Sequence, residues 1–365
     1  MTALAWNRDA IDDAIDLAIA RTRSIDRSVE DFPHITENRR WQTTADGVWT
    51  GGFWAGLLWL CHERDRDAQS LERAARFTER LLPRAHDTTN HDLGFMFVPS
   101  AVKGWQLTGE PRYRAAALAA AQSLAAQYNA RAGYIPGWGF FGSEGWNGNV
   151  LIDTLMNLPL LLWAVRQGAD QRLVEVVRGH TETTLAHLQR PDGSVYHMFR
   201  FDPLSGAPLG GATYQGYATE SAWSRGQAWA LTALALLGAR LGEPRYIAAS
   251  ERVADYFLAA LGDAGVPLWD FRAPGAAEPL DASAGAIASY GLQRLHEATG
   301  KSAYLDAAAR LLAALAETCA NRGEAGGLLL HATADLPHGH GIDESAMYGD
   351  YYYLKSLLRF PRRGR

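Results

Sequence analysis

The sequence predicts an all-α fold in which six helical hairpins close into a toroid, an (α/α)6 barrel. Apolar residues recur with a helical period over most of the chain. Three joints between helices have similar sequences, which is typical of a repeat architecture. Aromatic and polar clusters also precede alternate helices. We expect a single domain over residues 1–365, because one barrel commonly exceeds the usual domain length.

Apolar residues at i, i+3, i+4 and i+7 indicate about twelve helices with little strand signal. The predicted helices lie near residues 8–22, 51–64, 70–83, 95–108, 111–130, 149–166, 171–189, 219–241, 244–260, 283–297, 301–320 and 345–359. The similar joints, 108–113, 241–246 and 299–304, each have a glycine where one helix stops, and two have a proline where the next starts. Such joints predict tight hairpins, for which an open α-solenoid is the competing arrangement.

The composition is that of an ordinary globular protein, with 47% hydrophobic and 21% charged residues. A net charge of −5 gives no general attraction to nucleic acid or anionic membranes, so we expect neither as a partner. Cys61 and Cys319 lie in apolar helical stretches, which favours reduced thiols. The N-terminal segment carries acidic residues among its apolar positions, unlike a signal peptide, and indicates a cytoplasmic protein. Its oligomeric state is not readable from the sequence.

The clusters before alternate helices predict a binding site at one mouth of the barrel. They lie at residues 49–54, 91–95, 147–153, 214–227, 281–284 and 343–351. If alternate helices form the inner ring, their N-terminal ends open on one face and gather aromatic rings, carboxylates and an arginine there. Sugars present flat apolar faces and a rim of hydroxyls, so this mixture favours a carbohydrate site. Tryptophans at 49, 54, 138, 146, 223 and 229 belong to the clusters, although any one of them could instead fill the core.

Asp92 and Asp153 lie near the first turns of two successive inner helices, where they could act as general acid and base in one cleft. Each alone is equally explained as a helix-capping acid. Arg225 follows Trp223 closely and could bind a carboxylate through two hydrogen bonds, or neutralise a buried aspartate.

Further candidates for sugar contacts are His91, His197 and Gln215, each of which could instead satisfy backbone groups. The histidines show no metal-binding spacing, and those at 331, 338 and 340 lie in a glycine-bearing loop without a clear set of carboxylate partners. Acyl-transfer, dinucleotide and phosphate-loop motifs are absent from the sequence. We therefore expect neither a metal nor a cofactor.

At these clusters the sequence resembles the unsaturated glucuronyl hydrolases, glycoside hydrolase family 88. The matching strings are WTGGFWAG (49–56), HDLGFMF (91–97), LIDTLMNL (151–158), HMFRFDPLSG (197–206), TYQGYATESAWSRGQAWAL (213–231), DASAGAIA (281–288) and GDYYYLKSLLR (349–359). The string at 213–231 is the specific one, because it holds Gln215, Trp223 and Arg225 in place.

The resemblance implies an (α/α)6 barrel acting on a sugar with a C4=C5 double bond at the non-reducing end of a lyase product. It implies that Asp153 protonates C4, that water adds at C5, and that the hemiketal opens to expel the rest of the chain, while Asp92 stabilises the developing charge. It further implies sugar-binding roles for His91, Trp49, Trp138, His197, Gln215, Trp223, Arg225 and Trp229.

Three other interpretations stay open. The unsaturated rhamnogalacturonyl hydrolases share the barrel and the vinyl-ether chemistry. A carbohydrate-binding barrel without catalysis is another alternative, against which the retention of Asp92 and Asp153 argues. Epimerising or mutarotating barrels usually rely on paired histidines, whereas the paired groups here are aspartates. The aglycone and its sulfation are not readable, and Lys355 and Arg200 are the only candidate sulfate contacts.

Overall fold

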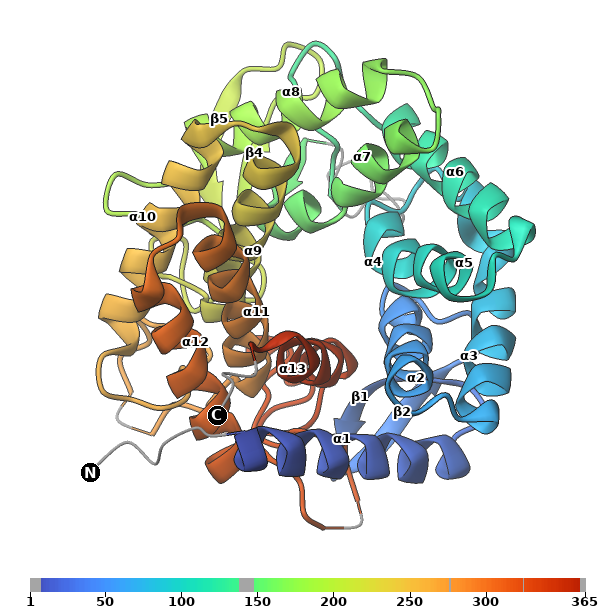
Figure 1. Cartoon of the computed structure of the whole chain (residues 1–365). Helices are drawn as coiled ribbons and strands as arrows, with labels where there is room; N and C mark the ends of the chain where they lie inside the picture. Colours follow the sequence, from blue (N-terminus) through green and yellow to red (C-terminus); the bar gives the residue numbers. More distant parts are fainter. Residues whose placement is uncertain (1–7, 138–147, 276, 324, 362–365) are drawn as a thin grey trace.

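The computed structural model describes residues 8–137, 148–275, 277–323 and 325–361, which form two concentric layers of helices in a closed ring (Figure 1). The outer layer consists of α1 (Arg8–Ser28), α3 (Ala68–Leu81), α6 (Pro111–Ala126), α8 (Arg172–His187), α10 (Pro244–Leu261) and α12 (Ser302–Ala314). The inner layer consists of α2 (Gly51–Asp65), α4 (Leu93–Phe97) with α5 (Lys103–Thr108), α7 (Pro159–Arg166), α9 (Ser224–Leu241), α11 (Ala282–Thr299) and α13 (Met347–Arg359). Because α13 packs against α2, the ring closes, which confirms the (α/α)6 barrel over the open solenoid.

The three similar joints are hairpins, as predicted. Gly109, Gly242 and Gly300 end α5, α9 and α11 with φ of +73°, +65° and +72°, a left-handed conformation that glycine adopts without strain. Each joint reverses the chain from an inner helix to the next outer helix. The repeated glycines thus set the alternation of the two layers.

The inner and outer helices differ in how much of their surface is buried. The inner helix α9 is buried continuously from Ser224 to Gly238, since it has neighbours on all sides. The outer helix α3 buries one stripe, with Ala74, Phe77 and Leu81 among its members, and exposes the opposite face. The core therefore fills the space between the two layers and the centre of the ring.

The segment 149–166, predicted as one helix, is instead a short strand, a 3₁₀ turn and a helix. Strand β3 (Asn149–Leu151) pairs with a distant strand, the 3₁₀ turn covers Ile152–Met156, and α7 begins at Pro159. Proline is favoured at the first position of a helix and breaks one further in, so the helix cannot run through it. The prediction of a helix from residue 219 was also early, because α9 begins at Ser224.

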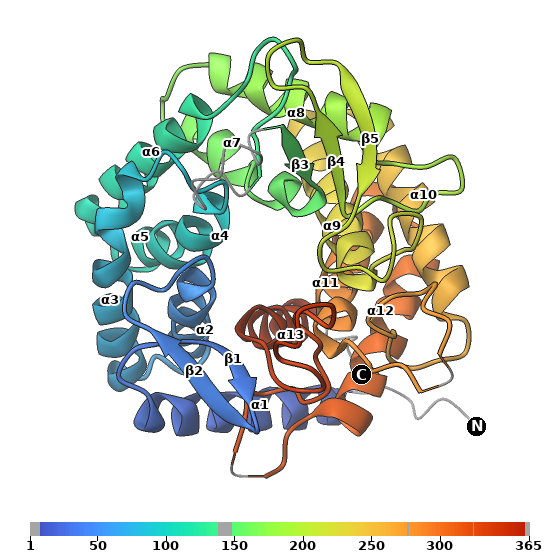
Figure 2. The same cartoon turned by 180° about the vertical axis from the view of Figure 1, so that it is seen from behind.

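Two small antiparallel sheets lie at one end of the barrel (Figure 2). One pairs β1 (Phe32–Glu37) with β2 (Arg40–Thr44), and the other has the order β3, β4 (Met198–Phe201), β5 (Pro208–Ala212). Their loops extend over the N-terminal ends of the inner helices (Figure 2). Among the described helices, none is long and apolar enough to cross a membrane.

Candidate active site

A cavity of about 610 Å³ opens at the N-terminal ends of the inner helices. It is lined by His34, Ile35, Trp49, His91, Asp92, Asp153, Tyr214, Gln215, Trp223, Arg225, Trp229, Ala334, Asp335, His340 and Tyr348. These residues come from the starts of α2, α4, α7, α9 and α13 and from the loops around them. Of the six predicted clusters, five thus contribute described residues to one mouth, whereas residues 281–284 do not line it. The cavity is large enough to enclose a sugar.

Asp92 and Asp153 both approach the same nitrogen of His91. The His91 Nε2 atom lies 3.4 Å from Asp92 Oδ1 and 3.6 Å from Asp153 Oδ1, so the imidazole interacts electrostatically with both carboxylates. Asp92 occupies the N-cap position of α4, yet its side chain makes no capping hydrogen bond. The capping explanation that the sequence left open is therefore wrong for Asp92.

Asn157 holds Asp92 in place and is a residue that the sequence analysis missed. Its Nδ2 donates to Asp92 Oδ1 at 3.1 Å, and its Oδ1 accepts from the backbone N–H of Phe95 at 2.7 Å. All three residues are buried. Asn157 lies within the string LIDTLMNL together with Asp153, which was the one available signal.

Burial sets the protonation of this group. It raises the pKa of Asp92 to about 6, with the charge of His91 opposing the shift and that of Asp153 adding to it. Burial alone would lower the pKa of His91, but the charges of Asp92 and Asp153 outweigh it and raise that pKa. The pKa of Asp92 is thus shifted toward neutral pH, and perturbed pKa values of this kind are typical of catalytic sites.

Aromatic side chains form the walls of the cavity. Trp49 stacks on Tyr348 with ring centroids 5.2 Å apart and an interplanar angle of 20°. Trp229 is 1% exposed and packs on Phe95 at 4.9 Å. Trp54 is fully buried and does not line the cavity, so it belongs to the core.

Two predicted tryptophans, Trp138 and Trp146, lie outside the described residues. Neither Lys355 nor Arg200 is among the described residues that line this cavity.

Arg225 lines the cavity, but much of its guanidinium is already occupied. Nη1 lies 2.6 Å from Asp281 Oδ2 and donates to the carbonyl of Thr333 at 2.7 Å, and Nη2 donates to the carbonyl of Ala334. Its guanidinium carbon lies 4.4 Å from the ring centroid of Trp223. The alternative in which Arg225 neutralises a buried aspartate is therefore confirmed, and any sugar contact comes in addition to it.

His197 and Gln215 organise the loop after β5. The Nδ1 atom of His197 accepts hydrogen bonds from the backbone N–H groups of Tyr214 and Gln215 at 3.0 and 3.2 Å. His197 packs on Trp223, and burial lowers its pKa to about 4. His197 thus satisfies backbone groups and is not among the described residues lining the cavity, whereas Gln215 lines it and donates to the Ala334 carbonyl at 3.0 Å.

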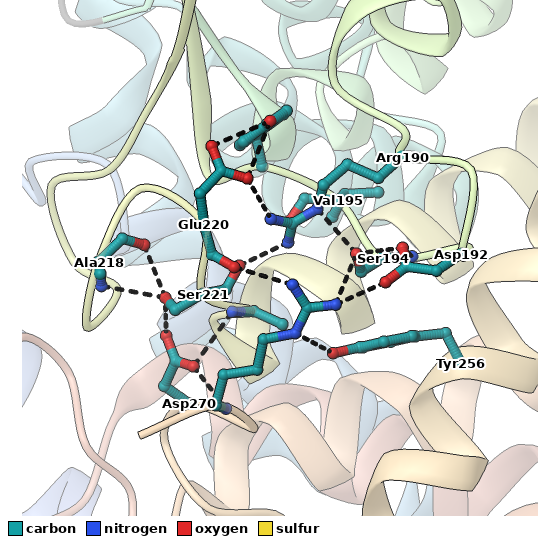
Figure 3. A network of polar contacts seen from close by, with 12 residues as sticks. Arg190, Asp192, Ser194, Val195, Ala218, Glu220, Ser221, Tyr256 and Asp270 are labelled. Carbon is teal, nitrogen blue, oxygen red and sulfur yellow. Dashed lines mark hydrogen bonds and ion pairs between the residues drawn. The ribbon is translucent and has the colours of Figure 1, made fainter. Parts of the chain in front are cut away.

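A polar network outside the cavity fixes the start of α9 (Figure 3). The carboxylate of Asp270 accepts hydrogen bonds from the Ser221 hydroxyl at 2.6 Å and from the Ala222 N–H at 3.1 Å. Arg190 donates to the carbonyl of Ser221. Since Trp223 follows directly, this network positions the wall of the cavity.

The loop 331–344 forms part of the rim, which the sequence did not predict. Two of its histidines each pair with one carboxylate: His331 Nδ1 lies 2.6 Å from Asp343 Oδ1, and His338 Nδ1 lies 2.8 Å from Asp335 Oδ1. Among the described residues neither pair belongs to a group that could hold a metal ion, which agrees with the lack of a clear set of carboxylate partners in the sequence. His338 also stacks on Tyr214 with ring centroids 4.0 Å apart. Asp335 and His340 line the cavity itself.

Among the described residues, His91, Asp92 and Asp153 are the one group whose side chains could share a metal ion, with ligand atoms within 4.8 Å of one another. Three such ligands fit a zinc site as well as an acid–base pair bridged by histidine. The independence from metal therefore stays a prediction, to be tested with a chelator.

The family model described as Glycosyl Hydrolase Family 88 matches residues 19–359. The unsaturated glucuronyl hydrolase of Bacillus sp. (strain GL1) is 37% identical over 98% of this chain and 97% of its own length. The unsaturated chondroitin disaccharide hydrolase of Streptococcus pyogenes serotype M1 is 36% identical over 97% and 92%. The solved structure of the Bacillus enzyme superposes with a TM-score of 0.91 at 34% identity, covering 97% of this chain and 100% of that one. The chain belongs to glycoside hydrolase family 88.

Proposed function

We propose that the protein hydrolyses lyase-generated oligosaccharides by releasing their terminal 4,5-unsaturated glucuronic acid. The observation that carries the proposal is the pair of carboxylates, Asp92 and Asp153, beside one buried histidine in an aromatic-walled cavity. Membership of family 88 supports it, since relatives over nearly the whole chain are named unsaturated glucuronyl hydrolases and unsaturated chondroitin disaccharide hydrolases. One related solved structure, 34% identical with a TM-score of 0.91, is a complex with dGlcA-Glc-Rha-Glc.

The reaction begins with protonation of C4 of the vinyl ether by Asp153. Its side chain is 16% exposed, against 8% for Asp92, which Asn157 also holds, so Asp153 is the carboxylate freer to reach the sugar. Protonation at C4 leaves positive charge shared by C5 and the ring oxygen. Asp92, fixed by Asn157, supplies the negative charge that stabilises it.

Water then completes the hydrolysis. Asp153, now ionised, accepts a proton from the water that adds at C5. The C5 hemiketal opens as its bond to the ring oxygen breaks and a ketone forms, and C1 becomes a hemiacetal that expels the second sugar. One water is consumed, and no nucleophile attacks the anomeric carbon.

The walls recognise the sugar ring and its carboxylate. Trp49, Trp223 and Trp229 offer apolar surface to the ring faces. Gln215 and Arg225 line the cavity and can bind the uronate. Arg225 would do so with the N–H donors that Asp281 and the backbone leave unused. We propose the same role for His91, through its ring, and for Trp138 and His197 on the resemblance of the sequence alone.

The test is loss of the ultraviolet absorbance of the conjugated double bond on incubation with unsaturated disaccharides. We expect the absorbance of glucuronyl substrates to fall in the presence of EDTA. A fall confined to rhamnogalacturonyl substrates would identify an unsaturated rhamnogalacturonyl hydrolase, and a steady absorbance with both substrates would identify a carbohydrate-binding barrel without catalysis. Activity that disappears with EDTA and returns with zinc would overturn the metal-independent mechanism. We also propose a cytoplasmic location, which the free, buried thiols of Cys61 and Cys319 favour and which fractionation of the producing cell tests.

A further inference from the structure

A second, smaller cavity of about 40 Å³ lies within the inner ring of helices. It is lined by Phe53, Gly94, Phe95, Val98, Pro99, Met156, Pro159, Leu236, Arg240, Tyr290, Tyr351, Tyr352 and Lys355. Its charged members are thus two cations, Arg240 near the C-terminal end of α9 and Lys355 in the second half of α13. We call it the lower cavity.

A layer of aromatic rings separates the lower cavity from the active site. Trp229 lines the active site and packs on Phe95 at 4.9 Å and on Tyr352 at 5.5 Å between ring centroids, and both of these rings line the lower cavity. A substrate in the active site therefore does not reach the two cations, and the proposed reaction gives them no role.

Both cations have hydrogen-bond donors without an acceptor among the described residues. The ammonium of Lys355 donates to the Tyr351 hydroxyl at 3.1 Å and lies 4.5, 4.9 and 5.4 Å from the ring centroids of Tyr290, Tyr351 and Tyr352. Arg240 Nη1 makes one long contact, 3.4 Å, with the carbonyl of Pro159. An ammonium has three N–H donors and a guanidinium has five, so most of them have no acceptor in the part of the chain that the structure describes.

No carboxylate of the described residues forms an ion pair with Arg240 or Lys355. The carboxylate of Glu63, whose charge acts on the lining residue Tyr351, is paired with Lys103 at 2.7 Å. Two partly buried cations in one small space repel each other and are costly to desolvate without a counter-charge. Aromatic faces recover only part of that cost.

The pKa shifts of the lining groups reflect cations placed among tyrosines. Burial lowers the pKa of Arg240, with Tyr290 opposing the shift and the charges of Arg166 and Arg294 adding to it. Burial alone would raise the pKa of Tyr290 and lower that of Lys355, but their mutual interaction outweighs it in both cases, so the pKa of Tyr290 is lowered and that of Lys355 is raised. Arg240 and Lys355 remain the only Lys, Arg, Asp or Glu side chains among the described residues that line the lower cavity, so an anion would complement it.

We propose that the lower cavity binds one small inorganic anion, chloride or a tetrahedral oxyanion such as sulfate or phosphate, between Arg240 and Lys355. A buried water needs about 10–15 Å³, so the lower cavity accepts one such anion and excludes an anion as large as gluconate. The anion joins α9 to α13 and stabilises the fold beneath the active site.

The test is thermal unfolding of the whole protein in sodium chloride, sulfate or phosphate, each against sodium gluconate at equal ionic strength. Gluconate is too large for the lower cavity. We expect a saturable rise of about 2 °C or more with at least one small anion. Sulfate and phosphate also stabilise proteins without binding, through exclusion from the surface, but that effect grows with concentration and does not saturate.

Two variants make the test specific. Lys355→Met keeps the apolar stem and should lose the saturable rise, whereas the matched surface variant Lys301→Met should keep it. Lys355→Glu supplies a carboxylate beside Arg240 and should be as stable in gluconate as the wild type is in the small anion.

Crystals soaked in bromide should show an anomalous peak in the lower cavity. The absence of that peak, or a saturable rise equal in wild type and Lys355→Met, would overturn the proposal. Should Lys355→Met fail to fold, Lys355→Glu and the bromide crystals still decide it.

Discussion

Replacing Asn157 by alanine removes the hydrogen bond that its side-chain amide donates to the carboxylate of Asp92. That bond favours the ionised form of Asp92, and a hydrogen bond to a charged group is worth about 1.5–3 kcal/mol. One pKa unit corresponds to about 1.4 kcal/mol, so the pKa of Asp92 should rise from about 6 by about 1–2 units. The Asp92 side chain is only 8% exposed, and solvent screening should therefore not reduce the effect much.

The sign of the effect on activity follows from the role of Asp92. If its negative charge stabilises the transition state, activity falls as pH drops through the pKa of Asp92. The acid limb of kcat/KM should therefore lie near pH 6 in the wild type and about 1–2 units higher in Asn157→Ala. The assay is the initial rate of double-bond loss against pH.

A buried asparagine far from the cavity provides the control. Asn321 is 2% exposed and donates to the carbonyls of Ala325 and Gly327 at 2.6 and 2.9 Å. Asn321→Ala should lower the unfolding temperature by a similar amount and leave the acid limb unchanged. If Asn157→Ala is folded at the assay temperature and its acid limb stays at the wild-type position, the electrostatic role of Asp92 is refuted.

Three further substitutions test the remaining parts of the site. Asp153→Asn should abolish turnover, by about 10²–10⁴-fold, yet bind an unsaturated disaccharide in calorimetry, and near wild-type rates would exclude Asp153 as the acid. Arg225→Ala leaves the buried Asp281 without its cation, so it should lower the free energy of unfolding by about 3–5 kcal/mol and also raise KM. A loss of stability with an unaltered KM would mean that Arg225 does not contact the uronate. Tyr214→Ala removes the ring that stacks on His338 at the rim of the cavity. If that ring contacts the second sugar, the variant should have a higher KM and an unchanged kcat. A KM equal to that of the wild type would place the second sugar elsewhere.

The architecture was predictable because its signals are local. A glycine at the end of a helix and a proline at the start of the next act over a few residues, and these joints are present as expected at Gly109, Gly242 and Gly300. Strand β3 was missed because its stability comes from pairing with β4, about fifty residues later in the chain. A three-residue strand carries too little periodicity to be distinguished from a helix.

The site was predictable where its residues start inner helices, and not where contacts across the ring decide. His91, Asp92 and Asp153 precede successive helices, so closure of the barrel alone brings them together. The partners of Arg225, which are Asp281 and the backbone near Thr333, lie more than fifty residues away in the sequence. Only the folded chain shows that Arg225 both pairs with a buried aspartate and lines the cavity.

The most direct test of the proposed reaction is to follow one unsaturated glucuronyl disaccharide by proton NMR while the wild-type enzyme acts on it. Hydration of the vinyl ether predicts that the vinylic H4 signal disappears before or together with the appearance of the free second sugar. Appearance of the free second sugar while the vinylic signal persists, as an unsaturated monosaccharide, would show attack at the anomeric carbon and contradict the mechanism.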